Sequence, residues 1–235
     1  TSGGSKTTPT VSPAVKSAAY KARQKLFEQV ARKWEIGVDD IASGDDTVFQ
    51  KSDPSKKMSW KEAASLIRGG PIVAMGEHID PPKIEGMQIG TPMRGAQFAE
   101  VEVNTATGKI DCKYIVAVQD CGKTLAKTQA ESQITGGVIQ GVSYALLENQ
   151  VMDTVKGRQI NANMEDYKIL TAMCMPEIEP IIVDVYDPVS NTSGKGLGEP
   201  PHIPTAAAIA CAVYNALGIP IRSLPITPDK VIGAL

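Results

Sequence analysis

The first long regular pattern of apolar residues in the chain has the spacing of a helix. Apolar residues three or four positions apart, which share one face of a helix, are Val15, Ala18, Ala22, Leu26, Val30 and Trp34. Ser12 and Pro13 come just before this run, and serine at the N-cap followed by proline at N1 is a strong helix start. The pattern predicts a long amphipathic helix that begins at Ser12.

Further along the chain the pattern changes to a period of two, which is typical of strands. Phe98, Glu100 and Glu102 alternate with Ala99, Val101 and Val103, so this segment predicts a strand. Asn104–Gly108 predicts a turn and Ile110–Val118 the second strand of a hairpin. A third strand is predicted at Ile181–Tyr186.

Three further segments have helical patterns and set the expected fold class. Helices are predicted at Trp60–Ile67, at about Thr124–Gln150 and at Thr205–Leu217, the last stopped by Gly218. The proline- and glycine-punctuated stretch His78–Pro92 predicts a loop. Hairpins beside long amphipathic helices indicate an α+β fold with mixed sheet hairpins.

Composition narrows the class of protein. The chain has 235 residues, 42% of them hydrophobic and 21% charged, with a net charge of −2. These values predict a globular chain rather than a disordered one, folded as one large domain or two small ones. No apolar run approaches the roughly 20 residues of a membrane span. The near-neutral charge and the 5% of aromatic residues argue against a nucleic-acid partner.

The four cysteines form no Cys-x-x-Cys pair, and the chain has only two histidines. This pattern predicts neither a zinc ribbon nor an iron–sulfur cluster within the chain. Free thiols in a chain of this size fit a reducing compartment, and we therefore expect a cytoplasmic protein.

The predicted helix at Thr124–Gln150 carries an unusual face. Its glycines, amides and one tyrosine at helical spacing are Gln133, Gly136, Gly137, Gln140, Gly141 and Tyr144. Each glycine inside a helix costs about 1 kcal/mol relative to alanine, so something must approach the backbone closely here. Either another helix packs tightly against this face, or a flat polar ligand lies over the glycines and Gln133 donates to it.

A second candidate is the segment Gly194–Pro201, which contains three alternate glycines followed by Glu199 and two prolines. It has neither the Lys-Ser/Thr ending of a phosphate loop nor the spacing of a dinucleotide fingerprint. Glycines let the backbone pass close to a bulky group, and the prolines hold the carboxylate rigidly. The spacing alone fits a glycine turn with a solvated glutamate as well as a general base at Glu199.

A third candidate is the hydroxyl-rich lead Thr7–Pro13 before the first helix. The free amides and dipole of a helix N-terminus attract anions such as phosphate, but a plain N-cap explains the same residues.

Together these segments resemble the C-terminal part of the molybdopterin-binding subunit of the molybdenum hydroxylases, the xanthine dehydrogenase/aldehyde oxidase family. The likeness runs in order from Thr8 to Leu235 and implies one cofactor-binding domain over residues 1–235. The motifs that carry it are Thr10-Val11-Ser12-Pro13-Ala14-Val15-Lys16-Ser17-Ala18, Asp120-Cys121-Gly122-Lys123, Gln133-Ile134-x-Gly136-Gly137-x-x-Gln140-Gly141, Gly196-x-Gly198-Glu199-Pro200-Pro201 and Leu224-Pro225-x-Thr227-Pro228.

The resemblance implies a molybdenum ion held by the dithiolene of a pterin, with no protein side chain as metal ligand. Glu199 would be the general base that takes the proton from the Mo–OH group, and hydride would pass from the substrate to a sulfido ligand. The residues implied in cofactor binding are Val15, Lys16, Ser17, Leu125, Ala126, Lys127, Thr128, Gln133, Gly136, Gly137 and Gly198. Leu125–Thr128 would form a loop that offers backbone amides.

The same resemblance implies a molybdopterin-dependent oxidoreductase that is active only with partner chains. One partner would carry the N-terminal part of the molybdopterin-binding unit, and others would carry 2Fe-2S clusters and FAD. The pterin would be the cytosine dinucleotide form, and the small-molecule substrate an N-heterocycle, purine or aldehyde hydroxylated with oxygen from water. The alternative is a non-catalytic assembly domain that keeps the fold and binds no cofactor.

Overall fold

The computed structural model describes residues 3–77, 93–187 and 192–235. The chain forms two compact units, which we call unit 1 (Thr1–Pro9 and Lys83–Leu235) and unit 2 (Thr10–Pro82). One cofactor-binding domain over residues 1–235 stays a prediction. The loop predicted at His78–Pro92 lies outside the described residues.

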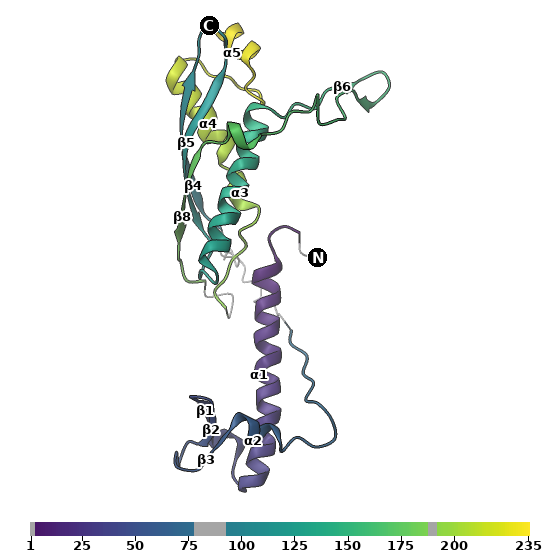
Figure 1. Cartoon of the computed structure of the whole chain (residues 1–235), viewed down its shortest axis with the longest axis vertical. Helices are drawn as coiled ribbons and strands as arrows, with labels where there is room; N and C mark the ends of the chain where they lie inside the picture. Colours follow the sequence, from purple (N-terminus) through teal and green to yellow (C-terminus); the bar gives the residue numbers. More distant parts are fainter. Residues whose placement is uncertain (1–2, 78–92, 188–191) are drawn as a thin grey trace, which may run out of the picture. The chain divides into compact units, whose positions relative to one another are not determined.

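Unit 1 is organised around a three-stranded mixed sheet of β4 (Gly95–Val103), β5 (Ile110–Asp120) and β8 (Glu177–Val183) (Figure 1). β4 and β5 form the predicted antiparallel hairpin, and β8 pairs parallel to β5. The prediction of the third strand at Ile181–Tyr186 was wrong at both ends. Its first half alternates glutamate with half-buried isoleucine and proline, and that weak signal was missed beside the apolar run that follows.

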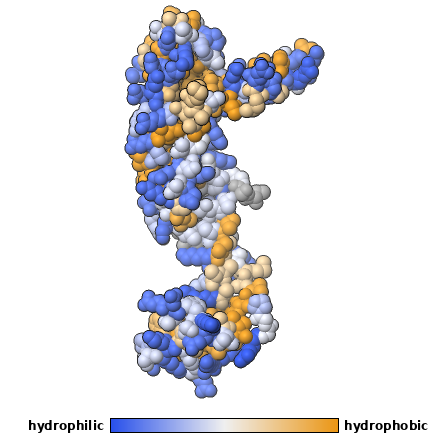
Figure 2. All heavy atoms as spheres, in the orientation of Figure 1, coloured by the Kyte–Doolittle hydropathy of each residue, from blue (hydrophilic) through white to orange (hydrophobic). Residues whose placement is uncertain are grey.

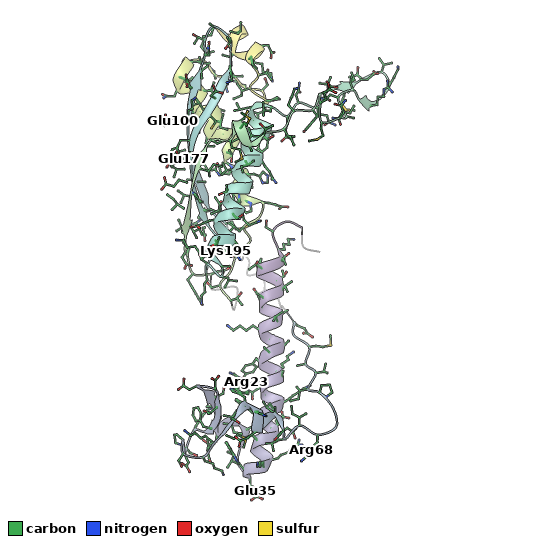
Figure 3. All side chains as sticks on the ribbon, viewed as in Figure 1. Arg23, Glu35, Arg68, Glu100, Glu177 and Lys195 are labelled. Carbon is green, nitrogen blue, oxygen red and sulfur yellow. The ribbon has the colours of Figure 1, made fainter. Side chains whose placement is uncertain are left out.

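Two helices, α3 (Lys127–Leu146) and α4 (Thr205–Leu217), pack on one face of this sheet (Figure 1). Between helices and sheet lies the core of the unit, whose fully buried members include Ile115, Ile134 and Ile209. The other face of the sheet carries Glu100 and Glu177, both exposed (Figure 3).

The helix predictions in unit 1 were correct in their centres. α4 has the predicted bounds and ends at Gly218, whose φ of 71° is the left-handed conformation that glycine adopts easily. α3 is shorter than predicted at both ends, so Leu125 and Ala126 precede it. Smaller elements complete the unit: β6 (Met152–Asp153), β7 (Arg158–Gln159), η2 (Ala172–Cys174), η3 (Pro200–His202) and α5 (Pro228–Ala234).

The long first helix, α1 (Thr7–Trp34), begins five residues before the predicted start at Ser12. Pro9 stands in its first turn, where no backbone N–H is needed for an intrahelical bond. Pro13 therefore lies inside the helix instead of at N1, and it is buried. From Thr10 onward α1 belongs to unit 2.

Unit 2 also contains a small antiparallel sheet that the sequence did not predict. Its strands are β1 (Ile41–Gly44), β2 (Thr47–Gln50) and β3 (Lys57–Ser59), preceded by η1 (Val38–Asp40). Strands of three or four residues are too short to show a period. Helix α2 (Trp60–Ala64) follows, shorter than the predicted Trp60–Ile67.

The core of unit 2 forms where α1 meets this sheet and α2. Its buried residues are Leu26, Phe27, Val30, Ala31, Ile41, Val48, Met58 and Ala63. Ser59 and Glu62 form a capping box at the start of α2, which satisfies two backbone donors reciprocally.

The fold confirms the α+β class. On the face shown in Figure 2, apolar and hydrophilic residues are interspersed in both units. Across the described part of the chain, no helix combines the length and apolar character needed to cross a membrane.

Candidate functional site

A cavity of about 470 Å³ in unit 1 is the candidate functional site. It lies where the end of β5, the start of α3 and the glycine segment before Glu199 come together with the first residues of the chain. Its walls are formed by Ser5, Thr7, Thr8, Cys121, Lys123, Thr124, Leu125, Ala126, Gln129, Ala130, Gln133, Lys195, Gly196, Leu197, Gly198 and Glu199. These residues come from segments nearly 200 positions apart in the sequence.

The N-terminus of α3 opens onto this cavity. The N-cap residue Ala126 provides no side-chain hydrogen bond, and the first turn contains no acidic residue. The first amides of a helix have no intrahelical acceptor, and the helix dipole makes this end electropositive. Lys123 and the hydroxyl of Thr124 line the cavity beside it. This wall therefore favours a ligand that carries negative charge.

Glu199 forms another part of the wall and is held through both its backbone and its side chain. Its N–H donates to Ser5 Oγ at 2.8 Å, and its Oε1 accepts from the Gly4 N–H at 3.3 Å. Pro200 and Pro201 then begin η3, and Pro201 is buried. Proline fixes φ, so the backbone on both sides of the Glu199 side chain is constrained.

Gln133 faces the same cavity from the second turn of α3. A Cβ added at Gly198 would lie 3.2 Å from Gln133 Oε1. The absence of a side chain at Gly198 therefore lets the amide of Gln133 come close to the backbone next to Glu199, and the carboxylate and the amide border one space.

One wall residue of the cavity, Lys195, forms a buried ion pair with Asp120. Lys195 Nζ lies 2.6 Å from Asp120 Oδ2, and the two side chains are only 5% and 7% exposed. Cys121 lies beside this pair, and burial raises the pKa of its thiol above the ordinary value. We therefore expect Cys121 to be a neutral thiol at physiological pH rather than a nucleophile.

The glycine face of α3 has two different environments. A Cβ at Gly137 would lie 2.8 Å from Pro201 Cβ, and a Cβ at Gly141 would overlap the Thr205 side chain, whereas a Cβ at Gly136 would meet nothing within 4 Å. Neither Gly136 nor Gly137 lines the cavity. Tight packing within the chain therefore accounts for Gly137 and Gly141, and the expectation of a ligand over Gly137 is corrected on this geometry.

Several other candidate residues do come together. Glu199, Gly198, Gln133, Leu125 and Ala126 all line the cavity. Lys127 and Thr128, expected in the amide-bearing loop, instead form the first turn of α3 and are exposed.

The remaining three candidates, Val15, Lys16 and Ser17, are on α1 within unit 2. Their part in cofactor binding stays a prediction. Val15 is 60% exposed.

Sequence reasoning missed some wall residues, notably Ser5, Gln129 and Lys195. Gln129 stands one helical turn before Gln133, and that spacing was a usable signal. Lys195 lies between two glycines in the candidate segment Gly194–Pro201. No local pattern marks Ser5, because its role depends on a contact with a residue 194 positions away.

Comparison with known proteins identifies the family of the chain. Residues 1–176 match the family model of the molybdopterin cofactor-binding domain. The match covers more than half of the chain, and the chain belongs to this family.

Curated relatives point to the same group of proteins. A putative xanthine dehydrogenase molybdenum-binding subunit of Escherichia coli is 39% identical over 140 residues, which cover 60% of this chain and 19% of the relative. The nicotine 6-hydroxylase large subunit of Paenarthrobacter nicotinovorans is 28% identical over 236 residues, covering 94% of this chain and 28% of the relative. The chain thus spans less than a third of the length of either relative.

Solved structures share the fold. The reconstituted CO dehydrogenase from Oligotropha carboxidovorans superimposes with a TM-score of 0.82 at 24% identity, over 98% of this chain and 29% of that chain. Quinoline 2-oxidoreductase from Pseudomonas putida 86 gives a TM-score of 0.76 at 24% identity, over 92% and 28%. At these identities the likeness establishes the fold alone.

Proposed function

We propose that this chain forms part of the molybdopterin site of a molybdenum hydroxylase and that Glu199 is its general base. The observation that carries the proposal is that the candidate base and the candidate cofactor-binding groups border the same cavity. In a chain of the molybdopterin cofactor-binding family, Glu199, Gln133 and the N-terminus of α3 border one cavity.

The residues of this cavity fit the cofactor chemically. A pterin is a flat heterocycle with hydrogen-bonding edges, and hydroxyl and amide side chains from Ser5, Thr124, Gln129 and Gln133 line the walls. Its phosphate would be stabilised by the N-terminus of α3, because unpaired amides and the helix dipole favour anions. Of the candidates, Gln133, Gly198, Leu125 and Ala126 would touch the cofactor. We assign no contact to Gly136 or Gly137.

The chemistry divides between cofactor and chain. When bound, the molybdenum of the cofactor supplies an acceptor for the two electrons removed as a C–H group becomes C–OH with oxygen from water. The Glu199 carboxylate accepts the proton released from that water. The hydrogen bond from the Gly4 N–H holds the carboxylate, since a general base requires a fixed position, and Gln133 orients polar groups beside it.

The rest of the enzyme is proposed on the names of the relatives, which are a molybdenum-binding subunit and a large subunit. We infer a partner segment or chain that completes the molybdopterin-binding unit, together with chains carrying 2Fe-2S clusters and FAD that accept the electrons. We propose the cytosine dinucleotide form of the cofactor and a cytoplasmic location. The substrate class is an N-heterocycle, a purine or an aldehyde.

The test replaces Glu199 with glutamine in the complex purified from its native host. Glu199→Gln should lower kcat by about 10²–10⁴-fold, the usual contribution of a general base, and leave the molybdenum content near that of the wild type. Glu100→Gln is the matched control, because Glu100 is an exposed glutamate on β4 (Figure 3), and it should change neither quantity.

Two outcomes would contradict the proposal. Wild-type kcat in the Glu199→Gln complex would remove the assignment of the base. A wild-type complex without molybdenum or pterin would favour the alternative, a non-catalytic assembly domain.

A further inference from the structure

We propose that Lys195 and Asp120 are positioning residues whose buried ion pair fixes the segment leading to Glu199, and hence the place of its carboxylate in the cavity. The consequence for catalysis rests on the proposed function of Glu199. We call this ion pair between Lys195 and Asp120 the tether. It is a property of the fold, and its effect on the segment can be tested without measuring catalysis.

The pair differs from the other ion pairs between described residues. Its side chains are 5% and 7% exposed, whereas those of Lys109–Asp111, Lys113–Glu102 and Lys127–Glu131 are 36–80% exposed. A buried ion pair is often no more stabilising than apolar residues of the same volume, because both charges lose their hydration. Stability alone therefore gives little reason to have a lysine and an aspartate here, whereas a fixed, directional contact between two segments does.

Asp120 anchors the pair to the sheet. It is the last residue of β5, and its Oδ1 accepts from the Gly122 N–H at 2.8 Å while Oδ2 accepts from Lys195 Nζ. Both carboxylate oxygens are therefore engaged, one by the turn after β5 and one by the segment before Glu199. The end of a central strand is among the most rigid places available for such an anchor.

Backbone hydrogen bonds around the pair join the same two segments, the turn after β5 and the segment before Glu199. The Lys195 N–H donates to the Cys121 carbonyl at 2.9 Å, and the Lys123 N–H donates to the Ser193 carbonyl at 2.7 Å. Gly122 has a φ of 66°, and a Cβ there would overlap the Ser193 carbonyl. The side-chain pair thus locks a short two-strand contact, which places Lys195 at the end of the sheet (Figure 3).

Beyond Lys195 the chain reaches Glu199 through Gly196, Leu197 and Gly198. Gly196 packs against Ser5, whose carbonyl a Cβ at this position would overlap, whereas Gly198 is exposed and has no side chain to limit its backbone. Leu197 packs against the core, and the Glu199 N–H is held by Ser5 Oγ. Ser5 thus holds the end of the segment near Glu199, and the Lys195 ammonium is the charged anchor at its other end. Loss of that anchor should let the segment shift at the Lys195 end and change the position of Glu199.

The test uses a double variant, Lys195→Met with Asp120→Asn, in the complex purified from the native host. Asparagine at position 120 keeps an oxygen that can accept from the Gly122 N–H. Because both charges are removed together, no unpaired charge stays buried, and the variant chiefly removes the contact between Lys195 and Asp120. The matched control is Lys113→Met with Glu102→Gln, which removes an exposed pair between β4 and β5. Amide hydrogen exchange is measured on peptides covering residues 193–199, together with molybdenum content, kcat and KM.

The double variant should assemble and show faster exchange confined to residues 193–199 and the 121–126 turn. Per bound molybdenum, kcat should fall about 10²-fold, as expected when a reacting group is displaced by about 1 Å, with a smaller change in KM. The control should match the wild type in every measurement.

The proposal is overturned if exchange in residues 193–199 equals that of the wild type, or if the variant fails to assemble, since the pair would then support the fold as a whole. Faster local exchange with unchanged kcat in a molybdenum-loaded complex would refute its link to Glu199. A wild-type complex without molybdenum would defeat the proposed function, while the exchange result would still decide whether the tether exists.

Discussion

Two glycine-rich parts of unit 1 look alike in the sequence and differ in the structure. On α3, the chain itself occupies the space beside Gly137 and Gly141. Pro201 and Thr205 stand where side chains at these two positions would lie. In the segment before Glu199, Gly198 borders the cavity. A glycine in the sequence signals a close approach, but only the fold shows whether the approaching group is protein or leaves room for a ligand.

The packing glycines still act on the site indirectly. By letting η3 approach α3, Gly137 sets the position of Pro201, which stands two residues after Glu199. The packing of the helix face therefore affects the position of the segment that carries Glu199. Substitutions at individual glycines can separate packing from ligand binding.

The largest effect is expected from Gly141→Val. A branched side chain there would collide with Thr205, which is fully buried, and overpacking of this kind costs about 1–3 kcal/mol, occasionally more. The free energy of unfolding, measured by denaturant titration, should fall accordingly. Ser132→Val, on an exposed position of the same helix, should have little effect. Equal stability of the two variants would show that α4 is not held against this face.

A smaller effect, of another kind, is expected from Gly198→Ala. The added methyl group would stand 3.2 Å from Gln133 Oε1 and 3.5 Å from Ser5 Oγ, and the exposed side chain of Gln133 can move aside. The melting temperature should therefore change little, while molybdenum content of the purified complex should fall. Gly37→Ala, which meets nothing within 4 Å in unit 2, is the control. Full molybdenum content in Gly198→Ala would mean that this part of the cavity is not used by the cofactor.

The smallest effect is expected from Gly136→Ala and has the opposite sign. The position is helical, and a Cβ there would meet nothing, so alanine should stabilise the helix by about 0.5–1 kcal/mol. An increase in the free energy of unfolding with unchanged molybdenum content would sharpen the contrast with Gly141. A loss of molybdenum would instead place a ligand over this glycine.

What the sequence could predict follows the length of each pattern. The β4–β5 hairpin was predictable because the alternation over Phe98–Val103 is followed by a turn signal, and α4 because a helical period runs through its 13 residues. The sheet of unit 2 was not, since its strands have three or four residues and its core depends on α1. The start of α1 was misplaced because Ser12 and Pro13 imitate a helix start inside a longer helix.

The site was partly predictable for a related reason. Glu199 and Gln133 belong to local motifs, and those motifs could be read in isolation. The pairing of Lys195 with Asp120 joins positions 75 residues apart, and no periodicity links them. The alternatives at Gly137 could be separated only when its neighbour Pro201 was known.

The contact of Ser5 with Glu199 has a consequence for the order of folding. The two residues are 194 positions apart, and closing so long a loop costs conformational entropy that is recovered only after the contact forms. The sheet hairpin and α3 depend on much more local contacts, which generally form sooner. We therefore expect this wall of the cavity to form late, after most of unit 1 has folded, so that the cavity takes its final shape in an almost finished protein.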